Sequence, residues 1–173
     1  AGARVLARMG LSFDAWMYFP QLPELAEFAR AIPDLTIILN HIGGMLRVGP
    51  YANRDEEVLP NWRQGLADVA QCPNVFVKLG GIGQPRTGYD WSARDIPIGS
   101  EELAGVMAPY MDYCIEQFGP SRCMFESNFP PDKVGHSYNV LFNAFKRLSK
   151  DYSASERADM FHNTAVRAYR VEY

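Results

Sequence analysis

The hydrophobic positions of this chain fall into four short apolar runs, each ending in polar, proline or glycine-rich sequence. Runs of β-branched, aliphatic and aromatic residues of this length are typical of strands. The run at 35–40 is apolar on both alternating faces, which predicts a strand buried on both sides. The predicted strands span 11–19, 35–40, 74–79 and 122–128.

Segments with helical spacing of apolar residues separate these runs. The predicted helices span 1–9, 24–31, 58–71, 100–118, 137–148 and 155–169. Strand and helix thus alternate four times, with crossovers long enough for parallel pairing, which predicts an α/β fold in one domain spanning 1–173. Four strands cannot close a barrel. A (β/α)₈ barrel needs about 250 residues, so this length corresponds to about half of one.

The composition narrows the class of protein. With 173 residues, 47% hydrophobic and 21% charged, the chain is globular. A net charge of −3 without a Lys/Arg run lacks the electrostatic footprint of a nucleic-acid binder. No apolar run approaches the roughly 18 residues of a membrane span, and no signal pattern begins the chain. Cys72, Cys114 and Cys123 lack CxxC spacing, so we expect reduced thiols in a cytoplasmic protein.

Polar residues gather where the predicted strands end. In parallel α/β sheets the carboxyl ends of the strands meet at one edge, where ligands bind. A hydrophobic core does not require several polar groups at such places, because each buried polar group needs a hydrogen-bond partner. His41 there is open to three roles: metal ligand, general base or electrophile. The polar strand-end residues are Tyr18, His41, Lys78, Glu126 and Asn128.

Several of these positions also have structural interpretations. Lys78 either orients a substrate or pairs with Glu126 inside the sheet. Asp132 is a substrate contact, a surface ion pair or an N-cap of the following helix, and the cap is favoured. His136 and His162 are expected to have no role in the site. The glycine-rich segment 80–83 lacks GxGxxG and Walker spacing, so it is interpreted as a tight turn.

Four motifs together resemble the amidohydrolase superfamily, specifically the amidohydrolase-related branch of TIM-barrel hydrolases that includes sugar lactonases and pyrone-dicarboxylate lactonase. They are LNHIGG at 39–44, VFVKLGG at 75–81, RCMFESNFP at 122–130 and NTAVRAY at 163–169. The resemblance implies that the four strands are the fifth to eighth of the barrel. The chain would then be its C-terminal half, with the N-terminal half absent.

The resemblance also assigns roles. His41 matches the family's histidine after strand six, and the family's final Gly-Ser-Asp-Trp-Pro matches a segment in which Asn128 replaces the aspartate. An amide cannot take a proton from water, so hydrolysis would need Glu126, Asp132, His41 or a metal-bound hydroxide as base. The family's first-strand His-x-His is not in this chain. The resemblance therefore implies either one divalent metal, zinc or manganese, with His41 as a ligand, or a metal-free site.

The expected activity is hydrolysis of a lactone or similar cyclic ester of a small carboxylated or sugar-derived substrate. Two alternatives stay open: a metal-dependent non-oxidative decarboxylase and a non-catalytic fragment or pseudoenzyme. Half a barrel leaves edge strands unpaired, so we expect the chain alone to be inactive, and to belong to a longer chain or to form a homo-oligomer. The expected catalytic residues are His41, Glu126 and Asn128, and the expected substrate-binding residues are Tyr18, Lys78 and Asp132.

Overall fold

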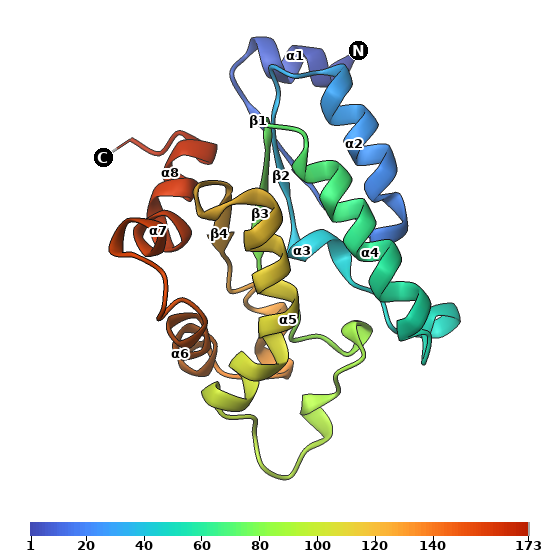
Figure 1. The fold of residues 1–173 in the computed structure, drawn as a ribbon, viewed down its shortest axis with the longest axis vertical. Coiled ribbons are helices and arrows are strands. Elements are labelled where there is room, and N and C mark those ends of the chain that lie inside the picture. Colours follow the sequence, from blue (N-terminus) through green and yellow to red (C-terminus); the bar gives the residue numbers. More distant parts are fainter. Residues whose placement is uncertain (173) are drawn as a thin grey trace.

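The fold is a parallel four-stranded sheet flanked by helices, seen in a computed structural model that describes residues 1–172 (Figure 1). Its strands lie side by side in chain order, β1-β2-β3-β4, and every neighbouring pair is parallel. The predicted α/β class and parallel pairing are confirmed. The strands are β1 (Ser12–Ala15), β2 (Thr36–Leu39), β3 (Val75–Leu79) and β4 (Cys123–Phe125).

The predicted helices are present, with shifted boundaries. They are α1 (Gly2–Arg8), α2 (Leu22–Ala31), α4 (Asp55–Ala70), α5 (Ser100–Phe118), α6 (Tyr138–Leu148), α7 (Ala154–Ala158) and α8 (Thr164–Tyr169). The predicted helix at 155–169 is interrupted by a π-helical turn, Asp159–Asn163. Helix α4 begins three residues before the predicted position because acidic side chains in its first turn favour a helix N-terminus.

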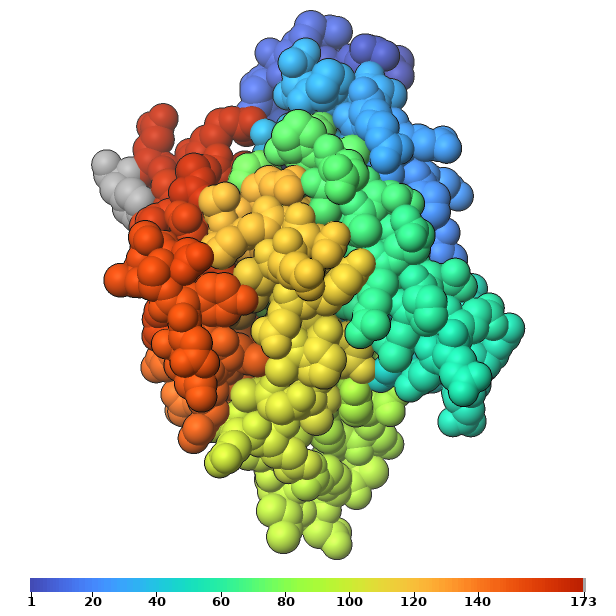
Figure 2. Space-filling model, viewed as in Figure 1, coloured from blue at the N-terminus to red at the C-terminus, as the bar shows by residue number. Residues whose placement is uncertain are grey.

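One face of the sheet packs against the long helices and forms the main core. Ile37, Leu39 and Val77 are fully buried there, together with Trp62 and Leu66 of α4. Figure 2 shows the outer surface of these helices, which hides the sheet from this side. Ile38, on the opposite face, is also fully buried. The prediction that this strand is buried on both sides is therefore confirmed.

The opposite face of the sheet is covered in part by α8. Ile38 and Met124 pack there against Ala168, with Phe76 beside them. This small second cluster places the C-terminal helix against the strands on the face turned away from α2, α4 and α5 (Figure 1). Polar strand residues on this face therefore lie close to the helix as well as to one another.

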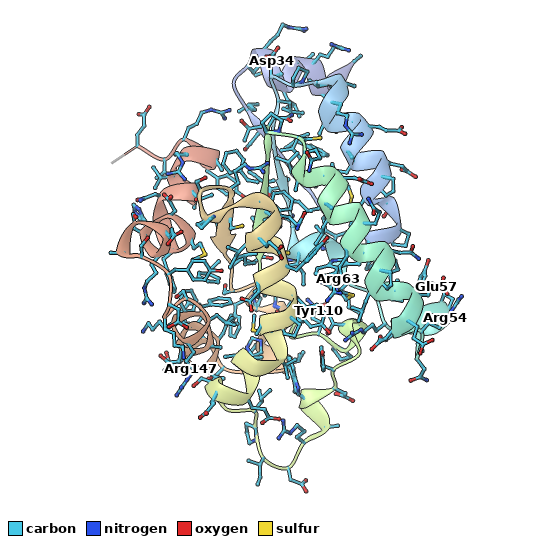
Figure 3. All side chains as sticks on the ribbon, in the orientation of Figure 1. Asp34, Arg54, Glu57, Arg63, Tyr110 and Arg147 are labelled. Carbon is cyan, nitrogen blue, oxygen red and sulfur yellow. The ribbon has the colours of Figure 1, made fainter. Side chains whose placement is uncertain are left out.

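Charged side chains such as those of Arg54 and Glu57 project outward from the helices (Figure 3). The side chains of Cys72, Cys114 and Cys123 are free thiols, all of them buried. No helix in the described part of the chain is long and apolar enough to cross a membrane.

Candidate functional site

The segment after β2 places His41 at the carboxyl end of the sheet. All four residues of this turn, α3 (His41–Gly44), have positive φ angles: 55°, 48°, 76° and 65° in order. Two of them, His41 and Ile42, are not glycine, and such residues cost on the order of 1–3 kcal/mol each in this conformation. Trp62 Nε1 helps to hold the turn by donating to the Ile42 carbonyl at 2.7 Å. The backbone thus adopts an unfavourable conformation, and this conformation sets the direction of the His41 imidazole.

The two glycines that follow Ile42 suggest backbone room for a ligand beside His41. At Gly44 this room is filled by the chain itself. A Cβ there would lie 1.8 Å from the carbonyl oxygen of Met17, so the segment that follows β1 packs directly on the glycine. Gly44 therefore lets the segments after β1 and β2 pack closely.

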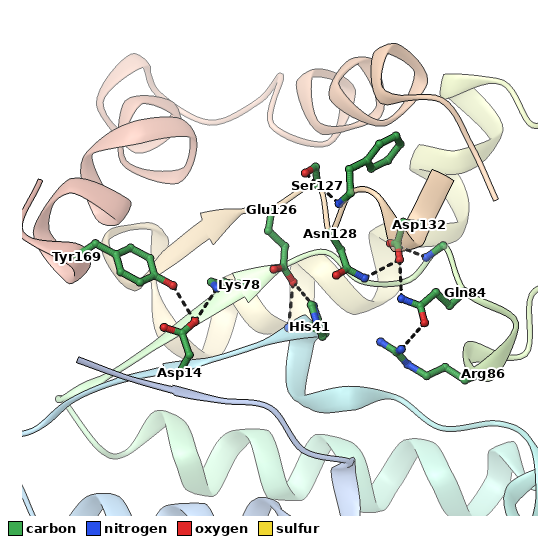
Figure 4. Close-up of polar contacts among 12 residues, drawn as sticks. Asp14, His41, Lys78, Gln84, Arg86, Glu126, Ser127, Asn128, Asp132 and Tyr169 are labelled. Carbon is green, nitrogen blue, oxygen red and sulfur yellow. Dashed lines mark hydrogen bonds and ion pairs between the residues drawn. The ribbon is translucent and has the colours of Figure 1, made fainter. Parts of the chain in front are cut away.

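His41 and Glu126 form the central pair of the site (Figure 4). Nδ1 of His41 lies 2.6 Å from Oε1 of Glu126, and the backbone N–H of His41 donates to the same oxygen at 3.0 Å. The two side chains are only 12% and 13% exposed. A carboxylate can only accept, so this geometry assigns the proton of a neutral imidazole to Nδ1 and leaves a lone pair on Nε2.

Two glycines after β3 make room for this pair. A Cβ on Gly81 would lie 2.6 Å from atoms of the His41 ring, and one on Gly80 would lie 2.4 Å from Cγ of Glu126. Gly81 also has φ +73°, which a side chain would strain. The tight turn predicted for this segment is wrong, because 80–82 form no turn and only a bend is present at Gly83. Sequence reasoning missed the purpose of these glycines, which is to let the imidazole and the carboxylate approach the backbone.

Asp132 is the second polar centre, and it is 1% exposed. One carboxylate oxygen accepts the backbone N–H of Gly83 at 3.0 Å. The other accepts from the amides of Gln84 at 3.0 Å and Asn128 at 2.6 Å (Figure 4). The cap and surface ion-pair interpretations of Asp132 are wrong, because this buried carboxylate accepts from Gly83 and Gln84 of the loop after β3 and from Asn128 after β4. Helix α6 is capped instead by Ser137.

Asn128 is oriented by this carboxylate. Its φ of 49° is a conformation that asparagine adopts more readily than most residues. Since its amide nitrogen donates to Asp132, the amide oxygen points away from that carboxylate and can accept a hydrogen bond. Asn128 can therefore orient a water molecule but cannot deprotonate it.

Lys78 belongs to a different cluster. Its Nζ donates to Oδ1 of Asp14 at 2.7 Å, and Tyr169 of α8 donates to the same oxygen at 2.8 Å. The predicted pairing of Lys78 with Glu126 is wrong, because Glu126 is bonded to His41 and Asp14 faces Lys78 across the sheet (Figure 4). Burial lowers the pKa of Lys78, but bonds to Asp14 and Tyr169 outweigh it, so the net shift is upward.

Tyr18 lies beyond the end of β1 and packs edge-to-face on Trp16, with ring centroids 5.2 Å apart. Its backbone N–H donates to the side chain of Gln21 at 3.2 Å. Within residues 1–172 no hydrogen bond joins its hydroxyl to His41 or Glu126. The structure thus brings His41 into contact with Glu126 and Asn128 with Asp132, and gives Tyr18 no bond to either pair.

The donor set at the strand ends falls short of what a divalent metal requires. No group of three His, Cys, Asp or Glu side chains among residues 1–172 is arranged to hold a metal ion. His41 and Glu126 are two usable ligand types, but they bond each other. These residues alone do not fit a metal site, and a metal here would need donors from outside them.

Comparison with known sequences gives a consistent family assignment. The sequence profile of the family described as Amidohydrolase matches residues 1–171. An uncharacterized protein, y4mH, of Sinorhizobium fredii is 39% identical over 170 residues, which are 98% of this chain and 50% of that protein. An L-fucono-1,5-lactonase of Burkholderia multivorans is 28% identical over 92% of this chain and 51% of its own length. The chain spans about half the length of the curated relatives it matches.

A solved structure agrees with the sequence relatives. A Burkholderia multivorans amidohydrolase with bound zinc superimposes with a TM-score of 0.83 and 26% identity, over 99% of this chain and 56% of that one. This match confirms that the sheet corresponds to half of a TIM barrel.

Proposed function

The chain belongs to the amidohydrolase family, and on that premise we propose that the protein containing it hydrolyses a lactone or similar cyclic ester of a small carboxylated or sugar-derived molecule. The observation that carries the proposal is the largely buried contact between His41 Nδ1 and Glu126 Oε1. It leaves Nε2 as a base at the end of the sheet where TIM barrels bind substrates. The name of the L-fucono-1,5-lactonase relative supports the substrate class.

In the proposed reaction, Nε2 of His41 takes a proton from water while the water oxygen attacks the lactone carbonyl carbon. The ring C–O bond then breaks, and the leaving alkoxide takes the proton back from the imidazolium. Products are the open hydroxy acid and the regenerated imidazole. General acid–base catalysis of this kind contributes about 10²–10⁴-fold. Glu126 stabilises the imidazolium and fixes its rotation, so we assign it as a positioning residue and His41 as the base.

Asn128 would supply the second contact to the attacking water. Its amide nitrogen is bound to Asp132 at 2.6 Å, which leaves the amide oxygen as an acceptor of fixed direction. A water that donates one hydrogen to this oxygen and the other to Nε2 of His41 would present an oxygen lone pair to the substrate. Asp132 is buried and both of its carboxylate oxygens accept hydrogen bonds. We therefore propose that it positions Asn128 and does not contact the substrate directly.

Substrate orientation is proposed for Tyr18 and Lys78. The ammonium of Lys78 has three N–H donors, and its bond to Asp14 leaves donors for a substrate oxygen. Its side chain keeps 19% of its surface exposed. The Tyr18 hydroxyl would provide a donor and an acceptor beyond the end of β1, two strands away from Lys78 in the sheet. We further propose that the remainder of a longer chain completes the barrel and that residues 1–173 alone are inactive.

The test is proton release by the full-length protein with a panel of sugar lactones and muconolactone, read at several pH values. Pseudo-first-order hydrolysis above the buffer rate supports the proposal. No hydrolysis across the panel would overturn it. If carboxylated substrates release carbon dioxide and this release requires added divalent metal, the decarboxylase alternative is established instead. If the protein catalyses neither reaction, the pseudoenzyme alternative is supported.

A further inference from the structure

A cavity of about 600 Å³ lies beside the strand-end site, between the segment 91–97 and the start of α6. Three aromatic side chains form part of its wall: Trp91, Phe129 and Tyr138. Its volume is in the range of small-molecule sites. None of the lining residues belongs to the His41–Glu126 or Asn128–Asp132 pairs, so the cavity is a separate feature of the fold.

His136 is one of the polar residues that line the cavity. It is 5% exposed, and its ring lies 6.0 Å, centroid to centroid, from those of both Trp91 and Phe129. Neither Nδ1 nor Nε2 has a hydrogen-bond partner within residues 1–172. Buried polar atoms are nearly always paired, so an unpaired imidazole in a cavity wall calls for a partner that the described chain does not provide.

The charged residues that line the cavity are both cationic. Arg94 and Lys133 line it, and no Asp or Glu among the described residues does. Arg94 donates to both carboxylate oxygens of Glu102, at 2.7 and 3.3 Å, so its positive charge is already paired. Lys133 has no carboxylate partner within residues 1–172. Its ammonium is therefore available to an anion entering the cavity.

We propose that this cavity binds a small ring-bearing carboxylate. The aromatic wall fits a planar or cyclic body, Lys133 pairs with the carboxylate, and the imidazole of His136 turns toward the cavity to donate to a carboxylate oxygen. Charge-assisted bonds of this kind are about twice as strong as neutral ones, so the site should separate an acid from its amide. The proposal is independent of the hydrolytic reaction.

The experiment is calorimetric titration of the full-length protein with benzoate and with benzamide, its neutral analogue. We expect benzoate to bind at least tenfold more tightly than benzamide. Lys133→Met and His136→Phe should each weaken benzoate binding about tenfold and leave benzamide binding nearly unchanged. Equal affinities for the two probes, or no measurable benzoate binding, would overturn the proposal.

Two control variants locate the effect. Lys150→Met removes an exposed lysine beyond the far end of α6 and should leave benzoate affinity unchanged. His41→Asn alters the strand-end site and should also leave it unchanged; a loss of binding there would place the anion at that site and contradict the proposal. If His136→Phe melts well below the wild type, Lys133→Met alone decides the outcome.

Discussion

Nδ1 of His41 and Oε1 of Glu126, 85 positions apart in the chain, lie 2.6 Å from each other, and the same oxygen accepts the backbone N–H of His41 at 3.0 Å. Two bonds from one residue to one oxygen fix both the position and the rotation of the imidazole. The left-handed turn after β2 carries His41, and the glycines after β3 leave space for the two side chains. The surrounding structure therefore fixes the orientation of the His41 side chain.

Glu126→Gln should separate positioning from binding. A glutamine oxygen keeps an acceptor near Nδ1 but removes the negative charge that stabilises the imidazolium. We expect kcat for lactone opening to fall about 10²–10⁴-fold while KM changes less than about threefold. Steady-state kinetics measures both. A large rise in KM with kcat unchanged would show that Glu126 binds substrate instead.

Gly81→Ala should displace the imidazole. The added Cβ would lie 2.6 Å from the ring of His41, and φ at this position is +73°, so both the ring and the backbone must move. We expect activity to fall at least about a hundredfold and the free energy of unfolding to fall by about 1–3 kcal/mol.

Gly105→Ala in α5 is the matched control for this change, because a Cβ added at Gly105 would have nothing within 4 Å of it. The variant should keep full activity and gain about 0.5–1 kcal/mol of stability, since alanine is the better helix former. Activity assays and denaturant unfolding of the two variants side by side make the comparison. Equal behaviour of the two would contradict the packing argument.

Asn128→Asp should destabilise the protein although it recreates the family's usual residue. It would place two carboxylates where the amide now donates to Asp132 at 2.6 Å. We expect a loss of about 2–3 kcal/mol near neutral pH and a smaller loss near about pH 4, where one carboxyl takes up a proton. Denaturant unfolding at both pH values measures it.

The exchanged pair, Asn128→Asp with Asp132→Asn, restores one donor and one acceptor between the two side chains. It should recover most of the stability lost by the single change. Failure of the exchange to recover any stability would show that the other donors to Asp132, Gly83 and Gln84, dominate that site.

His136 should give the protein a pH-dependent stability. Burial lowers its pKa below the ordinary value of 6.5, against the opposing charge of Asp132. The folded state then binds fewer protons than the unfolded chain, so this contribution is full above about pH 6.5 and is lost as the pH falls below it. His136→Phe should flatten this part of the stability curve. Unchanged pH dependence in the variant would contradict the assignment.

The strands and helices could be predicted because each leaves a local pattern in the sequence. The run at 35–40 is apolar on both faces, and Ile37 and Ile38 are indeed fully buried on opposite sides. The pairing of Lys78 could not be predicted, because its partner Asp14 is 64 positions away and is set by sheet register. The buried role of Asp132 depended on a loop 49 positions earlier that supplies the Gly83 N–H. The residues at the strand ends could be identified from the local sequence. Their hydrogen-bond partners could not, because these depend on the tertiary fold.

The most direct test of the central claim is kcat/KM for lactone opening by the full-length protein and by its His41→Asn variant. If Nε2 of His41 is the base, the variant should lose about 10²–10⁴-fold in kcat/KM, while its melting temperature stays within a few degrees of the wild type. A His41→Asn protein that folds normally and hydrolyses the lactone at the wild-type rate would contradict the account.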